Sequence, residues 1–200
     1  MYEITDKTLK KLKSQIWSKF LRTKASLKFD ELNVIKSSKT LYNDLNKLNK
    51  VVFLNIAREC YSQYSDKDTP SLAWVLAILG GYDVVTQYVY SHEVDRKRAR
   101  FAESVIASGN QMLPFQRAYN LWYRQTEQYA VTIEDMATIK AYKDNGVKKV
   151  RWVTEKDSKV CSICRERDGK IYNIDNIEKK PHINCRCYVI PVTKEGDNDG

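Results

Sequence analysis

The sequence predicts an α+β protein, in which a mostly helical N-terminal region is followed by a small β-rich C-terminal domain. Up to residue 145, apolar side chains recur at three- and four-residue intervals, the period of an amphipathic helix. After Gly146, apolar and polar residues alternate, as they do in half-buried strands. Four of the five cysteines, together with His182, lie in this second part, in the patterns C-x-x-C and H-x-x-C-x-C. Paired ligands at such spacing are typical of a small zinc-stapled unit.

Two helices are expected in the first 65 residues, each with a single apolar face. The apolar positions of the first helix are Leu9, Leu12, Ile16 and Phe20. Those of the second helix are Leu41, Leu45, Leu48 and Val52, and the pattern can continue through Ile56 to Cys60. Cys60 is expected to be a small buried apolar residue, because it stands apart from the other cysteines.

Three further helices are expected before residue 146. The turn-forming residues 65–70 predict a loop, and a short apolar helix over 71–79 follows it up to Gly80-Gly81. A charged helix should run from about Asp83 to Ser108, where Gly109-Asn110 stops it. Its apolar positions are Val94, Phe101 and Val105. The next helix should begin near Pro114 and close at Asn145-Gly146. One side of it is marked by Trp122, Tyr129, Ile133, Met136, Ala137 and Ala141.

The C-terminal part is expected to contain three strands. Val150, Trp152 and Thr154 alternate with polar or outward positions and predict the first strand. Asp168-Gly169 forms a tight turn that enters a strand at residues 170–172. Residues 187–192 predict the last strand, and Pro191 within it indicates an edge position.

These elements suggest four segments. Residues 1–110 form a helical, basic arm or bundle, and residues 111–145 form a helical connector. Residues 146–192 form the small Cys/His-rich domain, and the polar residues 193–200 form a disordered tail.

The overall composition favours acidic partners and excludes a transmembrane protein. The formal charge is +9 and the isoelectric point is about 9.2, so nucleic acid is the first partner to consider. No run approaches the length of a transmembrane helix, and the charged start lacks the apolar core of a signal peptide. A chain retained in a reducing cytoplasm uses a thiol cluster for metal more often than for disulfides.

The five candidate metal ligands are Cys161, Cys164, His182, Cys185 and Cys187. A domain of about 45 residues buries little core, so one structural zinc ion would supply the missing stability. In an extended strand Cys185 and Cys187 point the same way, so both can bind and leave His182 beside the site. His182 can equally replace one thiolate, giving three sulfurs and one nitrogen. Disulfide pairing and a catalytic zinc are the alternatives to a closed staple.

Several phrases between Arg124 and Val192 resemble the phage head-morphogenesis family, the minor head proteins of the Mu F type. The phrases are Arg124-Gln125-Thr126-Glu127, residues 141–147 (AYKDNGV), Lys149, Trp152, Thr154, Asp157, Val160, Cys161, Cys164, Asp168-Gly169 and residues 181–187 (PHINCRC). The family's closing signature has proline where Ile183 stands, and Gln125 is inserted between the arginine and threonine of its helix motif. Their order along about 70 residues carries the resemblance.

The resemblance implies a structural, non-enzymatic virion protein that joins the head during assembly in the host cytoplasm and sits in the capsid interior or at the portal vertex. Its expected partners are the portal protein, the major capsid or scaffolding protein, and non-specific DNA. The basic residues that would face such a partner are Lys10, Lys11, Lys13, Arg96, Lys97, Arg98, Arg100, Lys148, Lys149 and Arg151. Each basic run can equally be a solvated helix face.

Two other functional classes are considered. A small phage nuclease would need a histidine base, and only His92 and His182 are present. A zinc-bearing DNA-binding regulator would need a recognition helix after the ligands. Within the C-terminal domain, Trp152 is expected to be an apolar anchor. Arg186 should point away from its neighbouring cysteines, toward solvent or a carboxylate such as Asp157 or Glu127.

Overall fold

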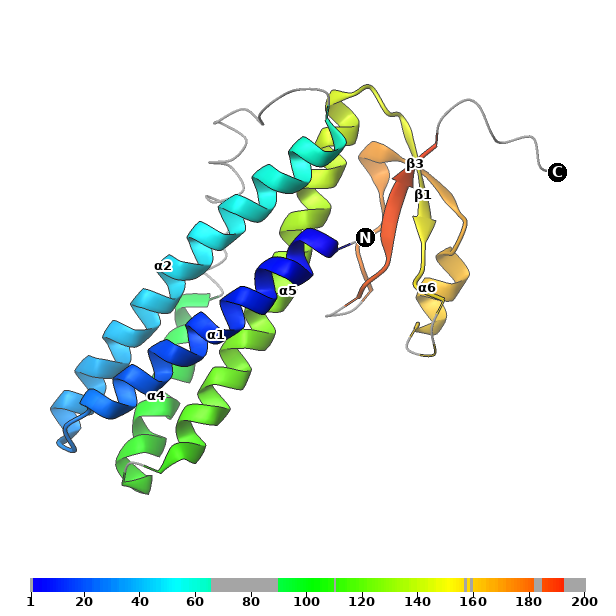
Figure 1. Ribbon diagram of the computed structural model, residues 1–200. Helices are drawn as coiled ribbons and strands as arrows, with labels where there is room; N and C mark the ends of the chain where they lie inside the picture. Colours follow the sequence, from blue (N-terminus) through cyan, green and yellow to red (C-terminus); the bar gives the residue numbers. More distant parts are fainter. Residues whose placement is uncertain are drawn as a thin grey trace.

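The computed structural model describes residues 2–65, 90–109, 111–156, 158, 160–181 and 185–192, with only the backbone described for 90–94. Within these residues a helical bundle leads into a small three-stranded sheet (Figure 1). The predicted α+β class, with helices first and a β-rich C-terminal domain last, is confirmed. The helix predicted over 71–79 and the tail 193–200 lie outside the described residues.

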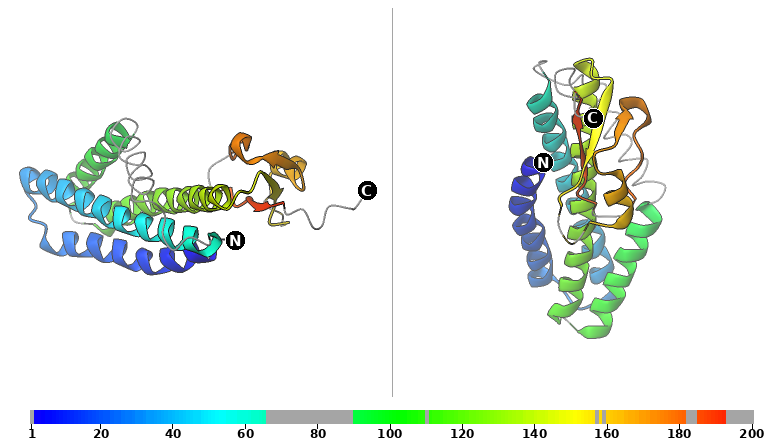
Figure 2. Two further views of the ribbon diagram at one scale, coloured as in Figure 1. Left: turned by 90° about the horizontal axis from the view of Figure 1, so that it is seen from above. Right: turned by 90° about the vertical axis from the view of Figure 1, so that its right-hand side faces the viewer.

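Four long helices form the bundle. Their bounds are Glu3–Ser26 for α1, Glu31–Tyr64 for α2, Tyr90–Ser108 for α4 and Met112–Asp144 for α5. Helix α2 contacts both α1 and α5, and α4 packs against α2 and α5. In both views of Figure 2, α1 and α4 lie on opposite sides of α5. The basic residues of α1 and those of α4 therefore belong to helices on different sides of the bundle.

The helical periods predicted the bundle core well. Leu9, Leu12, Ile16 and Phe20 of α1 are all buried. Leu41, Leu45, Val52, Ile56 and Cys60 of α2 are also buried, so the long continuation to Cys60 is confirmed. An aromatic group at one end of the bundle joins all four helices, with Phe101 between Phe20, Tyr42 and Phe115. The pairs of Phe101 with Phe20 and with Phe115 are edge to face, an arrangement that adds to the stability that burial provides.

Met136 is the exception among the apolar positions predicted for α5. It is 46% exposed, whereas Ile133, Ala137 and Ala141 on the same helix are buried. The reason is geometric, because α5 rotates by about 100° per residue and Met136 falls between the buried stripe and the solvent.

The helix ends follow their local sequence. The Asp30 side chain accepts a hydrogen bond of 2.8 Å from the backbone N–H of Asn33, which caps the start of α2. At the other end of the bundle, Gly146 has φ of +78° directly after the C-cap Asn145 of α5. A left-handed residue at this place ends a helix, and glycine adopts it without steric cost.

The sheet has the strand order β2-β1-β3, and both pairings are antiparallel. Its strands are β1 (Lys149–Val153), β2 (Ile171–Asn173) and β3 (Tyr188–Pro191). Val150, Trp152 and Thr154 are buried, as the alternation predicted, and β3 with Pro191 is an edge strand. A short helix α6 (Ser162–Arg167) lies between β1 and β2, and a 3-10 turn (Ile174–Asn176) follows β2.

Candidate metal centre

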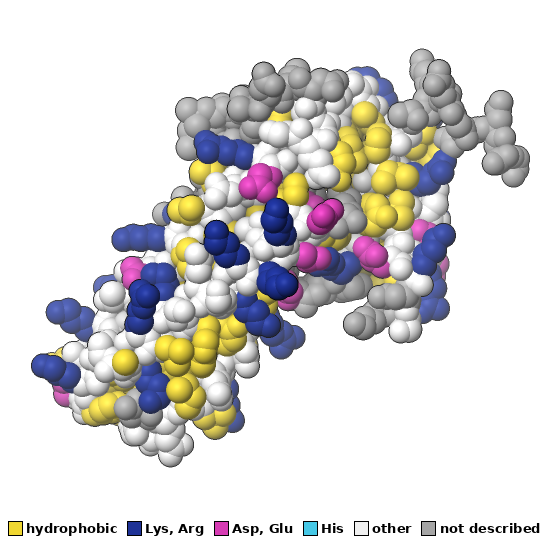
Figure 3. Space-filling view, in the orientation of Figure 1, with side chains coloured by type: hydrophobic (Ala, Val, Ile, Leu, Met, Phe, Trp, Pro, Cys, Tyr) yellow, Lys and Arg dark blue, Asp and Glu magenta, His cyan; other side chains and the backbone are white. Residues whose placement is uncertain are grey.

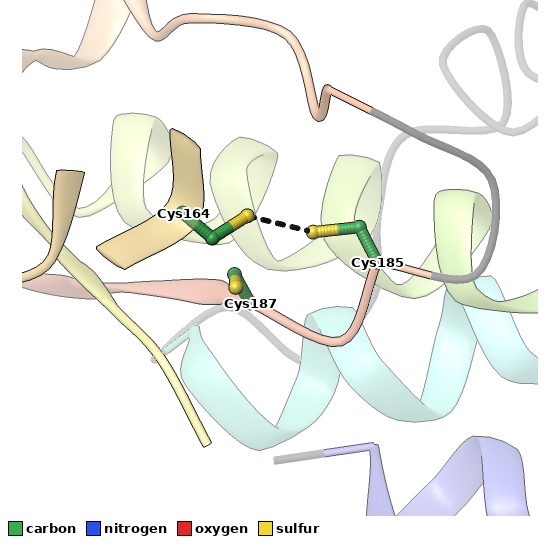
Figure 4. Close-up of side chains that lie close together, drawn as sticks. All are labelled: Cys164, Cys185 and Cys187. Atoms are coloured by element: carbon green, nitrogen blue, oxygen red, sulfur yellow. Dashed lines mark hydrogen bonds between the residues drawn. The ribbon is translucent and has the colours of Figure 1, made fainter. Parts of the chain in front are cut away.

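Three cysteine sulfurs meet in the interior of the C-terminal unit (Figure 4). The Sγ atoms of Cys164, Cys185 and Cys187 all lie within 4.8 Å of one another, and all three residues are buried. The Sγ atoms of Cys164 and Cys185 are 3.5 Å apart. Sulfurs bound to one tetrahedral zinc ion are about 3.8 Å apart, because each Zn–S bond is about 2.3 Å long. The spacing of the three thiols therefore fits a shared metal ion.

Two separate segments bring these sulfurs together. Cys164 sits on α6, and Cys161 caps that helix, since its Sγ accepts a hydrogen bond of 3.4 Å from the backbone N–H of Cys164. Cys185 and Cys187 come from the segment that leads into β3. All five cysteines belong to the described part of the chain, and none of them forms a disulfide bond.

The surroundings of the sulfurs are apolar, which disfavours the charged form of the Cys164 and Cys187 thiols. Burial raises the pKa of the Cys164 thiol, and the neighbouring sulfurs raise it further. Burial also raises the pKa of the Cys187 thiol, although its hydrogen bond with Cys164 opposes the rise. Three buried thiolates side by side would repel one another, so the charged form needs a cation to become stable. A soft divalent ion matches this donor set, because thiolates prefer zinc over harder oxygen-seeking ions.

The backbone next to the thiols is held by Tyr2, from the other end of the chain, and by Lys180 of the C-terminal unit. The hydroxyl of Tyr2, a residue that is 0% exposed, lies 2.9 Å from the carbonyl oxygen of Cys187. The Lys180 ammonium donates to the carbonyl oxygen of Cys185 at 3.3 Å. Lys180 also donates to the Tyr2 hydroxyl and pairs with Asp135 of α5 at 2.5 Å. The loop that carries two of the thiols is therefore fixed to α1 and α5.

Trp152 is a buried apolar anchor of the C-terminal unit, as the sequence predicted. It is 2% exposed and belongs to the same apolar cluster as Val150, Cys164, Cys185 and Cys187. The guanidinium of Arg167 lies 5.2 Å from the centre of its ring, a cation–π contact that shields the indole from solvent.

The structure brings together three of the five predicted ligands, with Cys161 next to them at the start of α6. His182 lies outside the described residues, so the choice between four thiolates and three thiolates with one imidazole stays a prediction.

Arg186 lies between two of the clustered cysteines and points away from them, but its partner differs from the expected ones. Its guanidinium donates two hydrogen bonds to the carboxylate of Asp6, of 3.1 Å and 2.7 Å, in a bidentate pair. The same guanidinium lies 4.6 Å from the centre of the Tyr2 ring. Glu127 is not the partner, and Asp157 lies outside the described residues. The pair Arg186–Asp6 adds a second tie between the cysteine loop and α1.

The ten predicted basic contact residues fall into three groups, on α1, on α4 and at the start of β1. Lys10 and Lys13 line an open groove with Trp17 and Tyr119. On α4, Arg98 pairs with Asp95 at 3.3 Å. Figure 3 shows Lys and Arg side chains scattered among hydrophobic ones on the face of α1 and α5, without a continuous basic stripe. Because α1 and α4 lie on opposite sides of α5, the basic groups of these two helices do not share one face.

The residues near the N-terminus that hold the cysteine loop could not be predicted from the cysteine motifs. Tyr2 and Asp6 are about 180 positions away from Cys187 and Arg186 along the chain. The one local hint is that Tyr2 breaks the polar start of the chain, which has no other aromatic residue before Trp17.

The fold and the thiol cluster agree with a comparison to known families. Residues 89–190 match the family model of phage Mu protein F-like proteins, and this range covers just over half of the 200 residues. It begins at the start of α4, includes all of α5 and ends within β3, so it contains every cysteine of the cluster. Neither a curated protein nor a solved structure matches the chain. No helix in the described part of the chain combines the length and the apolar character that crossing a membrane requires. The chain therefore belongs to the phage Mu protein F-like family, a family of minor head proteins.

Proposed function

We propose that this chain is a structural minor head protein of a tailed bacteriophage, which acts in head morphogenesis near the portal vertex and remains in the virion. The match over residues 89–190 carries this proposal, because it includes both the helical connector and the complete set of clustered cysteines. The role is one of assembly and contact, and the portal protein and the major capsid or scaffolding protein are the proposed partners.

The virion assignment is tested on particles of the phage that encodes the chain. Mass spectrometry of purified heads is expected to detect the chain at low copy number relative to the major capsid protein. A nonsense mutation in its gene should lower the yield of filled heads, and a plasmid copy should restore it. Absence of the chain from both procapsids and virions would contradict the proposal.

DNA contact is proposed as a weaker, non-specific function of the basic residues. Lysine and arginine contacts to phosphates release counterions, so affinity falls steeply as salt rises. Titration of a labelled duplex at low and physiological salt tests this, with Lys10→Glu/Lys13→Glu and Arg96→Glu/Arg98→Glu as separate variants. Loss in only one variant would assign the contact to α1 or to α4. A flat salt response would rule the contact out.

The C-terminal unit is proposed to hold one structural zinc ion. Cys164, Cys185 and Cys187 would each supply a thiolate, and Cys161 or His182 would supply the fourth ligand. Such an ion gives a small unit the stability that its limited core lacks. The residues of the chain orient the ligands, because α6 places Cys164 while Tyr2 and Lys180 fix the loop of Cys185 and Cys187.

Metal content and limited proteolysis test the zinc centre. Protein purified under reducing conditions without chelator should contain about one zinc per chain by elemental mass spectrometry. Cys164→Ser should lose the zinc and open residues 146–192 to protease, while the helices keep their circular dichroism.

Cys60→Ser is the matched control. Cys60 is equally buried but lies in α2, inside the bundle core. Its substitution should leave the zinc content unchanged even if it lowers the melting temperature. Equal zinc in the Cys164→Ser and wild-type proteins would contradict the proposed centre.

A further inference from the structure

A groove of about 420 Å³ runs between α4 and α5, near the turn that joins them. Its volume lies within the range of known small-molecule and cofactor sites, about 300–1,000 Å³. The buried rings of Tyr42 and Trp122 form its base. The groove lies away from the thiol cluster, and none of its lining residues is a proposed zinc ligand.

The α5 wall of the groove presents apolar side chains at helical spacing. Leu113 and Leu121 are 47% and 49% exposed, although both are large aliphatic residues. They stand eight positions apart with Arg117 between them, so all three lie along one stripe of α5. The stripe continues to Gln125. Twelve residues of helix span about 18 Å, which is the length of roughly three helical turns of a partner.

All the charged side chains that line the groove are basic. Four basic residues line it, namely Arg96, Lys97, Arg100 and Arg117, and no aspartate or glutamate is among its lining residues. Arg100 and Arg117 are exposed and make no ion pair with any residue that the structure describes. A ligand with carboxylates along one flank would therefore find complementary charge on both walls.

The chemistry of the walls favours a peptide over nucleic acid. Binding of single strands relies on exposed aromatic faces for base stacking. Here Tyr42, Phe101 and Trp122 are buried, and Tyr42 and Trp122 pack edge to face at 5.4 Å. The exposed apolar groups are the two leucines, which offer nothing to the polar backbone of a duplex. Leucine walls with a charged rim are instead the surface that receives an amphipathic helix.

We propose that the α4–α5 groove is the docking site for an acidic amphipathic helix of a partner protein. Its apolar face would lie on Leu113 and Leu121, and its acidic flank would face Arg100 and Arg117. The proposal adds an interaction surface and a partner chemistry to the assembly function, and it does not depend on the metal centre.

A designed peptide of about 18 residues tests this directly, with leucines on one helix face and glutamates beside them. Fluorescence anisotropy with the full chain should show binding, and NMR should show shifts of the Leu113 and Leu121 methyl groups. A peptide with lysine in place of glutamate should bind at least about 10-fold more weakly, because its charges repel the rim.

Two protein variants locate the contact. Arg100→Glu/Arg117→Glu should weaken binding of the acidic peptide by about 10-fold or more, since two attractions become repulsions. Lys36→Glu/Lys39→Glu is the matched control, because both lysines are exposed on α2 and lie outside the groove lining. It should change the affinity by less than about 2-fold, the effect of distant rim charges screened by salt.

Three results would overturn the proposal. They are absence of acidic-peptide binding, equal binding by the Arg100→Glu/Arg117→Glu and control variants, or displacement of the peptide by a DNA duplex that itself shifts the two leucine methyl groups. None of these depends on whether the chain enters the virion or binds zinc.

Discussion

Replacing Tyr2 by phenylalanine removes one buried hydroxyl and nothing else. This hydroxyl lies 2.7 Å from Oδ1 of Asp135 and 2.9 Å from the carbonyl oxygen of Cys187, and it accepts a hydrogen bond from Lys180. A hydroxyl carries a single proton, so it donates to one of the two acceptors at a time. The phenyl ring would keep its contacts with the Lys180 and Arg186 cations at 4.8 Å and 4.6 Å.

The expected loss follows from the charges around the hydroxyl. A hydrogen bond to a charged group contributes about 1.5–3 kcal/mol, and an unsatisfied buried partner costs a similar amount. Burial raises the pKa of the Asp135 carboxyl, while the Lys180 ammonium opposes that rise. Because Asp135 would keep Lys180, we expect Tyr2→Phe to cost about 2 kcal/mol in free energy of unfolding, below the sum of both bonds. For a chain of this size that corresponds to a fall of about 4–8 °C in Tm.

Urea denaturation of the wild type and Tyr2→Phe measures this loss. Tyr188→Phe is the matched control, because Tyr188 is half-buried beside Cys187 and its hydroxyl makes no hydrogen bond within the described residues. A double-mutant cycle with Asp135→Asn should show coupling between positions 2 and 135. A loss below about 0.5 kcal/mol, the range of ordinary surface substitutions, would refute the reasoning that this hydroxyl ties α1 to the cysteine unit.

Two further predictions concern the junction of the bundle and the sheet. Gly146→Ala should lower the free energy of unfolding, measured by urea denaturation, by about 1–2 kcal/mol. The loss would come from backbone strain alone, because φ is +78° and a Cβ at this position would contact nothing. An unchanged stability would contradict this. The hydrogen bond from Lys143 lowers the pKa of Asp175, so this pair stabilises the fold above the ordinary Asp pKa and loses that effect as pH falls through the lowered value. Carboxyl NMR titration should show the midpoint rise in Lys143→Met, and an unmoved midpoint would exclude the pair as the cause.

Local sequence patterns predicted the long helices, because each of these helices buries a continuous stripe of apolar side chains. The positions from Leu41 to Cys60 follow a single period, and one helix of 34 residues covers all of them. The same logic found the alternation in β1, since one face of that strand packs on the cysteine cluster. Helix α6 was not foreseen, because its six residues, which include Cys164, are too few to show a helical period.

Contacts between distant residues could not be predicted in the same way. The cysteine spacing identified the segment in which the sulfurs gather, but it did not indicate that Cys164, Cys185 and Cys187 form the close group while Cys161 caps α6. The predicted orientation of Arg186 was right, but its partner is Asp6. This partner could not be predicted, because the contact of α1 with the cysteine loop depends on tertiary packing. The groove of α4 and α5 has the same origin, because its lining residues come from these two helices and, through Tyr42, from α2.

The contact of Tyr2 with Cys187 also sets an order of events during synthesis. The two residues are 185 positions apart, so a ribosome that adds roughly 5–20 residues per second completes the partner some 10–40 seconds after Tyr2. During that interval the beginning of α1 has no cysteine loop to bind, and an aromatic residue destined for the interior stays accessible. The first helical turn of α1 can therefore reach its final packing only after the cysteine loop has been synthesised.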